Sequence, residues 1–290
     1  MLEEHMKIYD SNGQEIADIA KDNDVVRLVM LSTTGTHERV HEIFYGVGDT
    51  QDPQFEARLR NAYESNGFRF ESAKDIEQKT ARNVYFIHES NLIENIVEID
   101  EKLIGERYKK RTQLGCVGAW LLGEDRVKDK QPLSGKDVIS MQRMLTDEQA
   151  IYGHFLENKY RGIIRGENDL VSIGGRTVIP PRPEDYESFF TRFNGGLQQL
   201  NPRSIREILC YLAKTHVEYE SMHPFADGNG RTGRNIVNYG LSYFSLPVLV
   251  FTNQDKGKYY AGFIETTQDI SVMEAYFIEK YREQNPGLFQ

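Results

Sequence analysis

The segment from residue 204 to residue 244 constrains the fold most, because it predicts two helices joined by a short polar loop. The first helix should begin at Ser204, which opens the capping box Ser-Ile-Arg-Glu. It should end at His223, because Pro224 disfavours helix in the residue before it. A second helix is expected from about Arg231. Apolar spacing would bury Ile205, Leu209, Leu212 and His216 in the first helix and Ile236, Val237, Gly240, Leu241 and Phe244 in the second.

The loop between these helices and the first turn of the second helix, residues 223–234, read HPFADGNGRTGR and combine a base, a carboxylate, a glycine-rich turn and two arginines. A histidine at the edge of a loop can accept a proton near neutral pH. Gly228, Asn229 and Gly230 can adopt backbone conformations that turn successive N–H groups inward, beside the positive end of the following helix. The loop therefore predicts a phosphate-binding site with His223 as a base beside it.

Two arginines, Arg231 and Arg234, fall in the first turn of the second helix, where cations oppose the helix dipole. Their position indicates a bound anion that offsets this cost. Asp227 would repel a phosphate unless a divalent cation bridges the two, as Mg²⁺ commonly does for nucleotides. The sequence therefore predicts ATP with Mg²⁺ at this loop.

Further helices are expected earlier in the chain. Ser72 to Asp75 resembles a capping box and predicts a helix start. Residues 88–100 predict an amphipathic helix in which Ser90 and Glu94 share one face. On its other side, residues four apart would stack in the pairs Leu92 with Ile96 and Ile93 with Val97. Two more helices are expected over Leu114–Leu122 and Ser134–Leu145.

A tight hairpin is expected over residues 169–179, where Gly174-Gly175 separates two β-prone arms. Residues 10–13, Asp-Ser-Asn-Gly, predict another turn between short β-prone runs. The remaining signals in the first seventy or so residues are mixed, which suggests a small appended region.

Composition excludes several classes of partner. The formal charge of -9 argues against general nucleic-acid binding, which relies on Lys and Arg. No window approaches the roughly eighteen apolar residues of a membrane span, and the N-terminus has no signal-peptide pattern. Cys116 and Cys210 both lie in apolar stretches, which favours small core residues over a disulfide. We therefore expect a cytoplasmic protein with neither a nucleic-acid nor a membrane partner.

Residues 223–234 match every specified position of the motif HxFx(D/E)GNGRxxR, and the chain therefore resembles the Fic family. The resemblance covers roughly residues 80–280. Gly162-Ile-Ile-Arg165, followed by Ile173-Gly174-Gly175 and two prolines, looks like the family's GxxR segment and target-binding flap. The resemblance implies a mainly α fold with a Fic-type helical core, a short β-hairpin flap and a small N-terminal extension.

The implied activity is that of a protein adenylyltransferase, or AMPylator. In that family the histidine, here His223, deprotonates a Ser, Thr or Tyr hydroxyl of a target protein, which then attacks the α-phosphorus of ATP. By the same resemblance, Asp227 would hold Mg²⁺, and Arg231 and Arg234 would hold the outer phosphates. The Gly228-Asn229-Gly230 turn would cradle the phosphates. The flap residues Ile173, Gly174 and Gly175 would pair with an extended target segment as an added strand.

Residues 90–95, Ser-Asn-Leu-Ile-Glu-Asn, match the family's inhibitory motif (S/T)xxxE(G/N). Ser90, Glu94 and Asn95 occupy its specified positions. A Glu94 carboxylate paired with Arg234 would occupy the donors that hold the γ-phosphate, which predicts an autoinhibited enzyme. In some inhibited relatives the same glutamate positions water for removal of AMP, so the sequence leaves the direction of transfer open.

Two alternatives belong to other classes. His37, Glu38 and His41 form the sequence HExxH, which on a helix would bind zinc in a metalloprotease. Against this, Gly35 and Gly46 leave little room for a long helix, and no third ligand stands out. The second alternative is a non-catalytic module that binds nucleotide and presents the hairpin to a partner. The presence of His223 favours an enzyme.

The expected domain organisation has three parts. Residues 1–75 form an N-terminal region of unknown role, residues 76–105 an inhibitory helix segment, and residues 106–290 the Fic catalytic domain. An adenine pocket is expected near Tyr259 or Tyr260. Analogy with the family adds self-modification and homodimer formation as further options.

Overall fold

The computed structural model describes residues 4–9, 15–22, 25–30, 69–71, 73–173, 176–266 and 270–289. The chain divides into two compact units, residues 1–81 and 82–290. The division falls inside helix α3 (Ala73–Ile93), whose start lies next to the expected capping position Ser72, itself outside the described residues. The domain limits expected at residues 75 and 105 stay predictions.

The N-terminal unit contains a four-stranded antiparallel sheet in the order β3-β2-β1-β4. Its strands are β1 (Glu4–Tyr9), β2 (Glu15–Asp22), β3 (Val25–Met30) and β4 (Arg69–Glu71). β1 and β2 pair in a register that places Glu4 opposite Lys21 and Tyr9 opposite Glu15. They flank the expected turn at residues 10–13, which lies outside the described residues.

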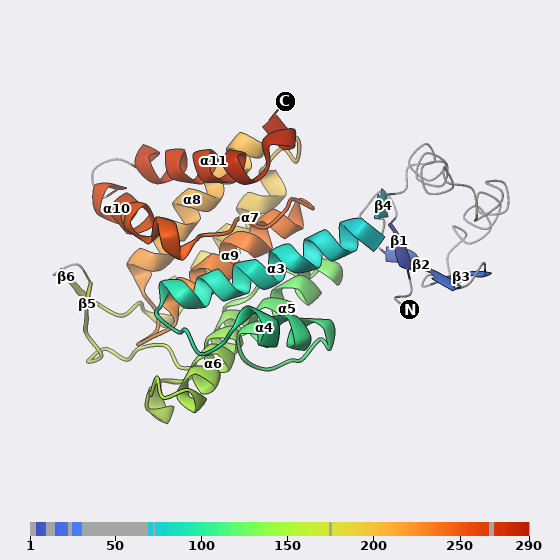
Figure 1. The fold of residues 1–290 in the computed structure, drawn as a ribbon. Coiled ribbons are helices and arrows are strands. Elements are labelled where there is room, and N and C mark those ends of the chain that lie inside the picture. The colour runs from blue at the N-terminus through green and yellow to red at the C-terminus, as the bar shows by residue number, and fades with distance from the viewer. Residues whose placement is uncertain are drawn as a thin grey trace. The chain divides into compact units, whose positions relative to one another are not determined.

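The second unit is built mainly from helices, which confirms the predicted fold class (Figure 1). After α3 these are α4 (Glu101–Lys109), α5 (Gly115–Lys128), α6 (Gly135–Ile151), α7 (Pro183–Gln199), α8 (Ile205–Met222), α9 (Asn229–Tyr243), α10 (Lys256–Thr266) and α11 (Ser271–Gln284). None of the described helices is apolar over enough of its length to cross a membrane.

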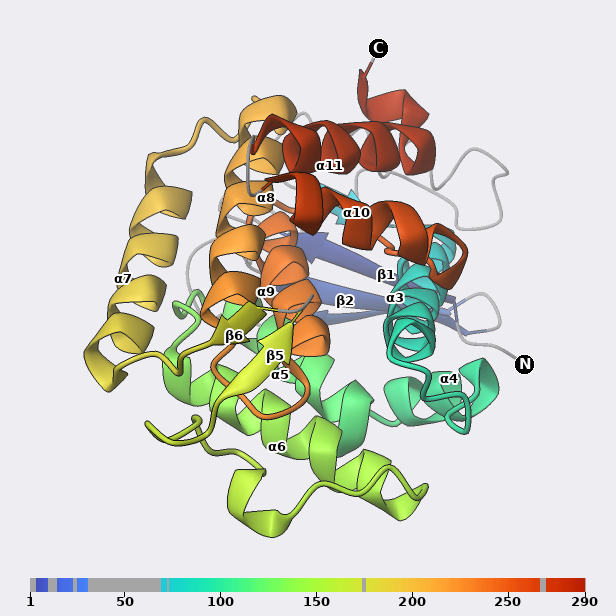
Figure 2. The same cartoon turned by 90° about the vertical axis from the view of Figure 1, so that its left-hand side faces the viewer.

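Helix α9 is the central element of this unit, and α5, α6 and α8 pack against it (Figure 2). Every residue from Arg231 to Leu241 is buried, so α9 is covered on all sides and not only along the apolar face that the sequence predicts. Buried polar groups need hydrogen-bond partners. Asn238 finds both of its partners in the backbone of Leu249, with Nδ2 donating to the carbonyl (3.0 Å) and Oδ1 accepting from the amide (2.7 Å).

The helix starts follow local capping signals to different degrees. Ser134 and Asp137 form a reciprocal capping box at the start of α6. Ser204 is the N-cap residue of α8, as predicted, but its side chain makes no capping hydrogen bond, so the predicted contact is wrong. The entry to α8 is instead organised by Asn201, whose side chain accepts from the Arg203 amide and whose carbonyl accepts from the Ser204 amide, both at 3.0 Å.

Helix α3 ends at Ile93, so the helix expected over residues 88–100 is too long. Asn95 takes a left-handed φ of 60°. The Ile96 amide donates to the Asn91 carbonyl (3.1 Å) and the Asn95 amide to the Leu92 carbonyl (3.0 Å). This pattern is a Schellman motif, which ends helices at a glycine or asparagine. The stacking expected for Val97 is therefore wrong, and its side chain is exposed.

The predicted hairpin consists of β5 (Val171–Ile173) and β6 (Arg176–Val178), which pair antiparallel with Ile173 opposite Arg176. The connecting residues Gly174 and Gly175 lie outside the described residues. The hairpin projects from the helices at the left of Figure 1. Its role as a flap stays a prediction.

Candidate active site

The loop from α8 to α9 is held in shape by its own side chains. Asn229 Oδ1 accepts from the Phe225 amide (2.9 Å), and Asn229 Nδ2 donates to the Phe225 carbonyl (2.8 Å). Phe225 is fully buried, and Asn229 is 2% exposed. The Asn229 side chain is therefore used by the loop, and only its backbone N–H remains for the anion site expected at residues 228–230.

His223 caps the C-terminal end of α8 with φ 45° and ψ 61°, a left-handed conformation that is uncommon for a residue with a side chain. Its Nδ1 lies 3.3 Å from the Glu220 carbonyl, so Nδ1 carries the hydrogen and Nε2 is left unprotonated. Burial lowers the pKa of His223 to about 4, although the Glu220 carbonyl acts to raise it. At pH 7 the imidazole is neutral, and Nε2 can accept a proton.

Helix α9 begins at Asn229, two residues before the predicted start, because Gly228 takes the N-cap position with φ 86°. The first helical bond runs from the Thr232 amide to the Gly228 carbonyl (3.0 Å). The N–H groups before it have no acceptor within the helix, and the helix dipole adds positive potential at this end. The glycine-rich turn therefore offers an anion site formed by the start of α9.

Arg234 is fully buried and is bound by the end of α3. Its Nε donates to Ser90 Oγ (2.9 Å), and its Nη2 donates to the Ser90 carbonyl (2.9 Å) and to Glu94 Oε1 (2.7 Å). Burial acts to lower the pKa of Arg234, but the Glu94 carboxylate raises it above its usual value. The ion pair predicted from the sequence is thus present, with Ser90 in the last turn of α3 and Glu94 directly after the end of that helix.

The Glu94 carboxylate also lies against the start of α9. A Cβ atom added at Gly230 would overlap Glu94 Oε1 and would come within 3.0 Å of Arg234 Nη1. Glycine at position 230 therefore lets the carboxylate approach the helix N-terminus. Glu94 stands where the sequence predicts a phosphate. Asn95, the third residue of the inhibitory motif, supplies the left-handed turn that ends α3 directly after this glutamate.

At the other side of the anion site, Asp227 and Arg231 are held by a glutamine of α6. Gln149 Nε2 donates to Asp227 Oδ2 (2.5 Å), and Gln149 Oε1 accepts from Arg231 Nη2. Gln142, two turns earlier in α6, donates to the Asp227 carbonyl (2.9 Å). Both glutamines are buried and were missed in the sequence, where the only available signal was their spacing of seven on one helix face.

The two tyrosines expected near adenine lie in different environments. Tyr259 is 1% exposed and its hydroxyl lies 2.8 Å from His216 Nε2, so it belongs to the core and is not accessible to a ligand. His216 is buried as predicted, and burial lowers its pKa to about 3. Tyr260 is 39% exposed. Of the two, only Tyr260 presents a surface that an adenine ring could contact.

No group of three or more His, Cys, Asp and Glu side chains converges on a metal position within the described part of the chain. The HExxH residues His37, Glu38 and His41 lie outside the described residues. The Asp227 side chain, which is hydrogen-bonded to Gln149, is 46% exposed.

These features define a class of protein: a helical fold with a neutral histidine beside a helix N-terminus that carries two buried arginines. Residues 132–241, which contain the whole loop, match the sequence model of the Fic/DOC family. Over these residues the chain carries a domain of the Fic/DOC type.

Several relatives named "Protein adenylyltransferase Fic" are similar to this chain. The Drosophila melanogaster protein is 26% identical over 250 residues, which are 86% of this chain and 45% of that protein. The Culex quinquefasciatus protein is 32% identical over 124 residues, 43% of this chain and 24% of that protein. The chain therefore spans less than half the length of these relatives.

Solved structures with the same fold include a Fic domain containing signaling protein from Bacteroides thetaiotaomicron, with a TM-score of 0.53 and 16% identity, over 84% of this chain and 94% of that one. Fic-1 of C. elegans (residues 134–508) is similar with a TM-score of 0.51 and 13% identity, over 88% of this chain and 83% of that one. At these identities the likeness concerns the fold.

Proposed function

We propose that this chain is a protein adenylyltransferase that transfers AMP from ATP to a hydroxyl group of a target protein. The observation that carries the proposal is the position of a neutral His223 in the loop that leads into α9, with no hydrogen bond to its Nε2 from the residues that the structure describes. The names of the relatives support the same reaction.

In the proposed step, His223 Nε2 takes the proton of the target hydroxyl as the hydroxyl oxygen attacks the α-phosphorus of ATP. The new bond joins this oxygen to the α-phosphorus, and the bond between the α-phosphorus and the bridging oxygen of the β-phosphate breaks. Pyrophosphate leaves with the bonding electrons. A base whose pKa lies below the working pH is in its proton-accepting form throughout.

The anion site supplies the groups that bind the phosphates. The free N–H groups at the start of α9 and the Arg231 guanidinium face an anion at this end of the helix. Arg231 Nε is buried and has no partner among the described residues, so a phosphate oxygen would satisfy it. Tyr260, half-exposed on α10, is the proposed contact for adenine.

Asp227 fits the role of a magnesium ligand. Mg²⁺ in nucleotide sites usually takes one or two protein carboxylates and completes its octahedron with phosphate oxygens and water. Asp227 provides one such carboxylate, held in place by the Gly228 amide and by Gln149. When bound, Mg²⁺ would neutralise charge on the phosphates. Gln149 would then orient the carboxylate that holds it.

We propose further that the described conformation is autoinhibited. Glu94 occupies Arg234 and lies at the α9 N-terminus, so an incoming γ-phosphate would compete with a carboxylate already in place. The ion pair is shielded from water, because Arg234 is 0% and Glu94 29% exposed. Removing Glu94 should leave the arginine free for ATP.

The test compares three proteins: wild type, Glu94→Gly and His223→Ala in the Glu94→Gly background. Each is incubated with α-³²P-labelled ATP, Mg²⁺ and a cell lysate. We expect labelled protein with Glu94→Gly, little with wild type, and none with the double variant. Label on the enzyme itself would identify self-modification, and the expected homodimer is tested by light scattering of the same samples.

The other outcomes separate the alternatives. If no variant labels protein, the release of AMP from a pre-labelled lysate is measured instead. Release by wild type but not by Glu94→Ala would show that the reaction runs in the reverse direction. Nucleotide binding without transfer or release would instead identify a binding module. Zinc-dependent cleavage of casein that is abolished by His37→Ala would overturn the proposal in favour of the metalloprotease.

A further inference from the structure

Arg165, outside the motif at residues 223–234, joins that loop to the hairpin segment. Arg165 is 3% exposed. Its Nε donates to the His223 carbonyl (2.8 Å), and the backbone amide of Arg165 donates to the Pro224 carbonyl (2.8 Å). Two consecutive carbonyls around the proposed base are therefore held by one residue.

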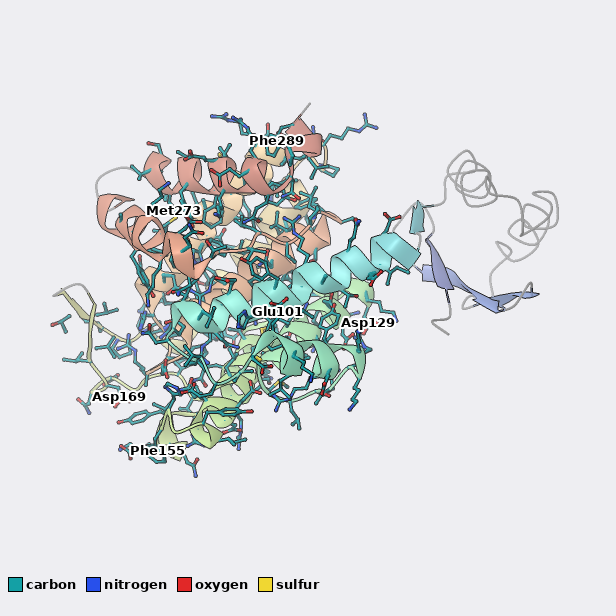
Figure 3. All side chains as sticks on the ribbon, viewed as in Figure 1. Glu101, Asp129, Phe155, Asp169, Met273 and Phe289 are labelled. Carbon is teal, nitrogen blue, oxygen red and sulfur yellow. The ribbon has the colours of Figure 1, made fainter. Side chains whose placement is uncertain are left out.

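The other side of the same guanidinium is fixed by the segment that carries the hairpin. Nη1 donates to the Asp169 carbonyl (2.6 Å) and to the Val178 carbonyl in β6 (3.1 Å). Asp169 lies at the base of the arm that carries β5 and β6 (Figure 3). Because a guanidinium is planar and rigid, its position against these two carbonyls determines where Nε meets the His223 carbonyl.

This arrangement is a costly way to achieve stability alone. Among the described residues Arg165 forms no salt bridge, and its Nη2 is buried without a hydrogen-bond partner. A buried donor on a charged group that has no hydrogen-bond partner destabilises the folded chain. The left-handed backbone of His223 is also unfavourable and persists only where neighbouring contacts enforce it. The cost is understandable if the arginine is needed to hold that backbone.

We propose that Arg165 is a positioning residue for the transfer reaction: it fixes the left-handed backbone of His223 and so aims the imidazole at the acceptor hydroxyl. This inference rests on the proposed adenylyltransferase activity. Among the described residues, Arg165 forms no hydrogen bond with those assigned to the phosphates, which are Gly228, Asn229, Gly230, Arg231 and Arg234. Its loss should therefore lower the maximal rate and leave ATP binding unchanged.

The kinetic test places Arg165→Met and Arg165→Lys in the active Glu94→Gly background and measures label transfer from ATP at a series of ATP concentrations. We expect Arg165→Met to lower the maximal rate on the order of 100-fold, the cost of misplacing a catalytic group by about 1 Å. The ATP concentration at half-saturation should stay within about twofold. Arg165→Lys should keep part of the rate, because a single ammonium group can bind either the His223 carbonyl or the carbonyls of the hairpin segment, but not both.

Arg161→Met is the matched control. Arg161 lies in the same loop, is 13% exposed and binds the Leu156 carbonyl (2.7 Å), but contacts neither His223 nor β6. It should leave the maximal rate unchanged. Should Arg165→Met fail to fold, Arg165→Lys carries the test. An unchanged maximal rate in both Arg165 variants, or parallel losses of rate and ATP affinity, would overturn the proposal.

A second readout does not depend on activity. The imidazole resonance of His223, assigned by its loss in His223→Ala, is titrated by NMR in wild type and in both Arg165 variants. In Arg165→Met, release of the backbone and loss of the Arg165 charge should move the pKa of His223 from about 4 towards its usual 6.5, whereas Arg165→Lys keeps the charge and should move it less. An unmoved pKa would sink the inference even if the proposed activity were itself wrong, whereas absence of label from Glu94→Gly alone would count against the activity.

Discussion

Arg231 and Arg234 lie three residues apart on α9 and are both almost fully buried, yet their partners differ in kind. Arg234 is paired with the carboxylate of Glu94, which lies 140 residues earlier in the chain. Arg231 is bound to the neutral amide of Gln149, and its distance to Asp227 Oδ1 is 3.8 Å. Burial lowers the pKa of Arg231, whereas Glu94 raises that of Arg234 against the effect of burial.

This difference shows which part of the anion site is open to a ligand, the part at Arg231, and which part Glu94 already occupies, the part at Arg234. A buried cation that has no anion within hydrogen-bonding distance gains most from an incoming phosphate. Arg231 is such a cation, and its neutral partner holds it in place without competing for its charge. Arg234 has its anion within the chain, so ATP must displace Glu94 before gaining this arginine. The two arginines should therefore respond differently to the same substitutions.

The largest contrast is expected in stability. Arg234→Met should lower the free energy of unfolding by about 3 kcal/mol, the lower end for breaking a buried ion pair, since Glu94 is 29% exposed. Arg231→Met should stay within about 1 kcal/mol of wild type, because it removes a buried charge along with one hydrogen bond to a neutral amide. Chemical denaturation of the two variants measures both values. Equal losses would show that Glu94 contributes no more to its arginine than Gln149 does.

The next largest difference between the two arginines is expected in their effect on ATP affinity. Arg231→Gln should weaken ATP binding on the order of 10- to 100-fold both with and without Glu94, the value of a charged hydrogen bond. Arg234→Gln should weaken it similarly in the Glu94→Gly background and hardly at all with Glu94 present, since Glu94 already occupies that arginine. Titration calorimetry on His223→Ala versions, which do not consume ATP, gives the four dissociation constants.

The exposed Arg192, which pairs with Glu218 on the surface, provides the control: Arg192→Gln should leave ATP affinity unchanged. If Arg234→Gln weakened ATP binding by the same factor with and without Glu94, the glutamate would not be the competitor of the γ-phosphate. The contrast between the two ends would then be one of folding stability alone.

The site residues that the sequence predicts lie close together in the chain or carry a local signal. Pro224 predicts the end of α8, and Gly228 can take the left-handed N-cap that starts α9. The motif at residues 90–95 led to the pairing of Glu94 with Arg234, although those residues are far apart in sequence. The fold class and the hairpin also follow from periodicity and turn residues, because these depend on neighbours within a few positions.

The failures share a physical cause, which is that polar side chains can be buried when another segment satisfies them. Gln142 and Gln149 look like a polar helix face, and only the folded chain brings Asp227 to them. Arg165 looks like a loop cation until the carbonyls of His223 and Val178 surround it. The end of α3 was misjudged for a related reason, since helical spacing continues past Asn95 while the backbone does not.

The smallest expected effect concerns Glu220, a carboxyl group on the Arg234 side of the contrast. Its Oε1 is buried and has no hydrogen-bond partner among the described residues, and a Cβ atom added at Gly233 would overlap it. Burial raises the pKa of Glu220 from 4.5 to about 8, Arg234 acts to lower it, and Glu94 acts to raise it. Glu94 and Glu220 both interact with Arg234, so Glu94→Gly should lower the pKa of Glu220. The interaction between Glu94 and Glu220 is screened and amounts to about 1 kcal/mol or less.

The sign of the effect makes it measurable. A carboxyl whose pKa is raised in the folded protein stabilises fully below its unfolded value of 4.5, and that stability is lost as the pH rises towards about 8. The difference in unfolding free energy between wild type and Glu220→Gln should grow over this range. The same difference, measured between Glu94→Gly and the variant that combines Glu94→Gly with Glu220→Gln, should level off at a lower pH. If Glu220→Gln had the same pH-dependent effect in wild type and in Glu94→Gly, Glu94 and Glu220 would not share Arg234. Glu94 alone would then account for the difference between the two arginines.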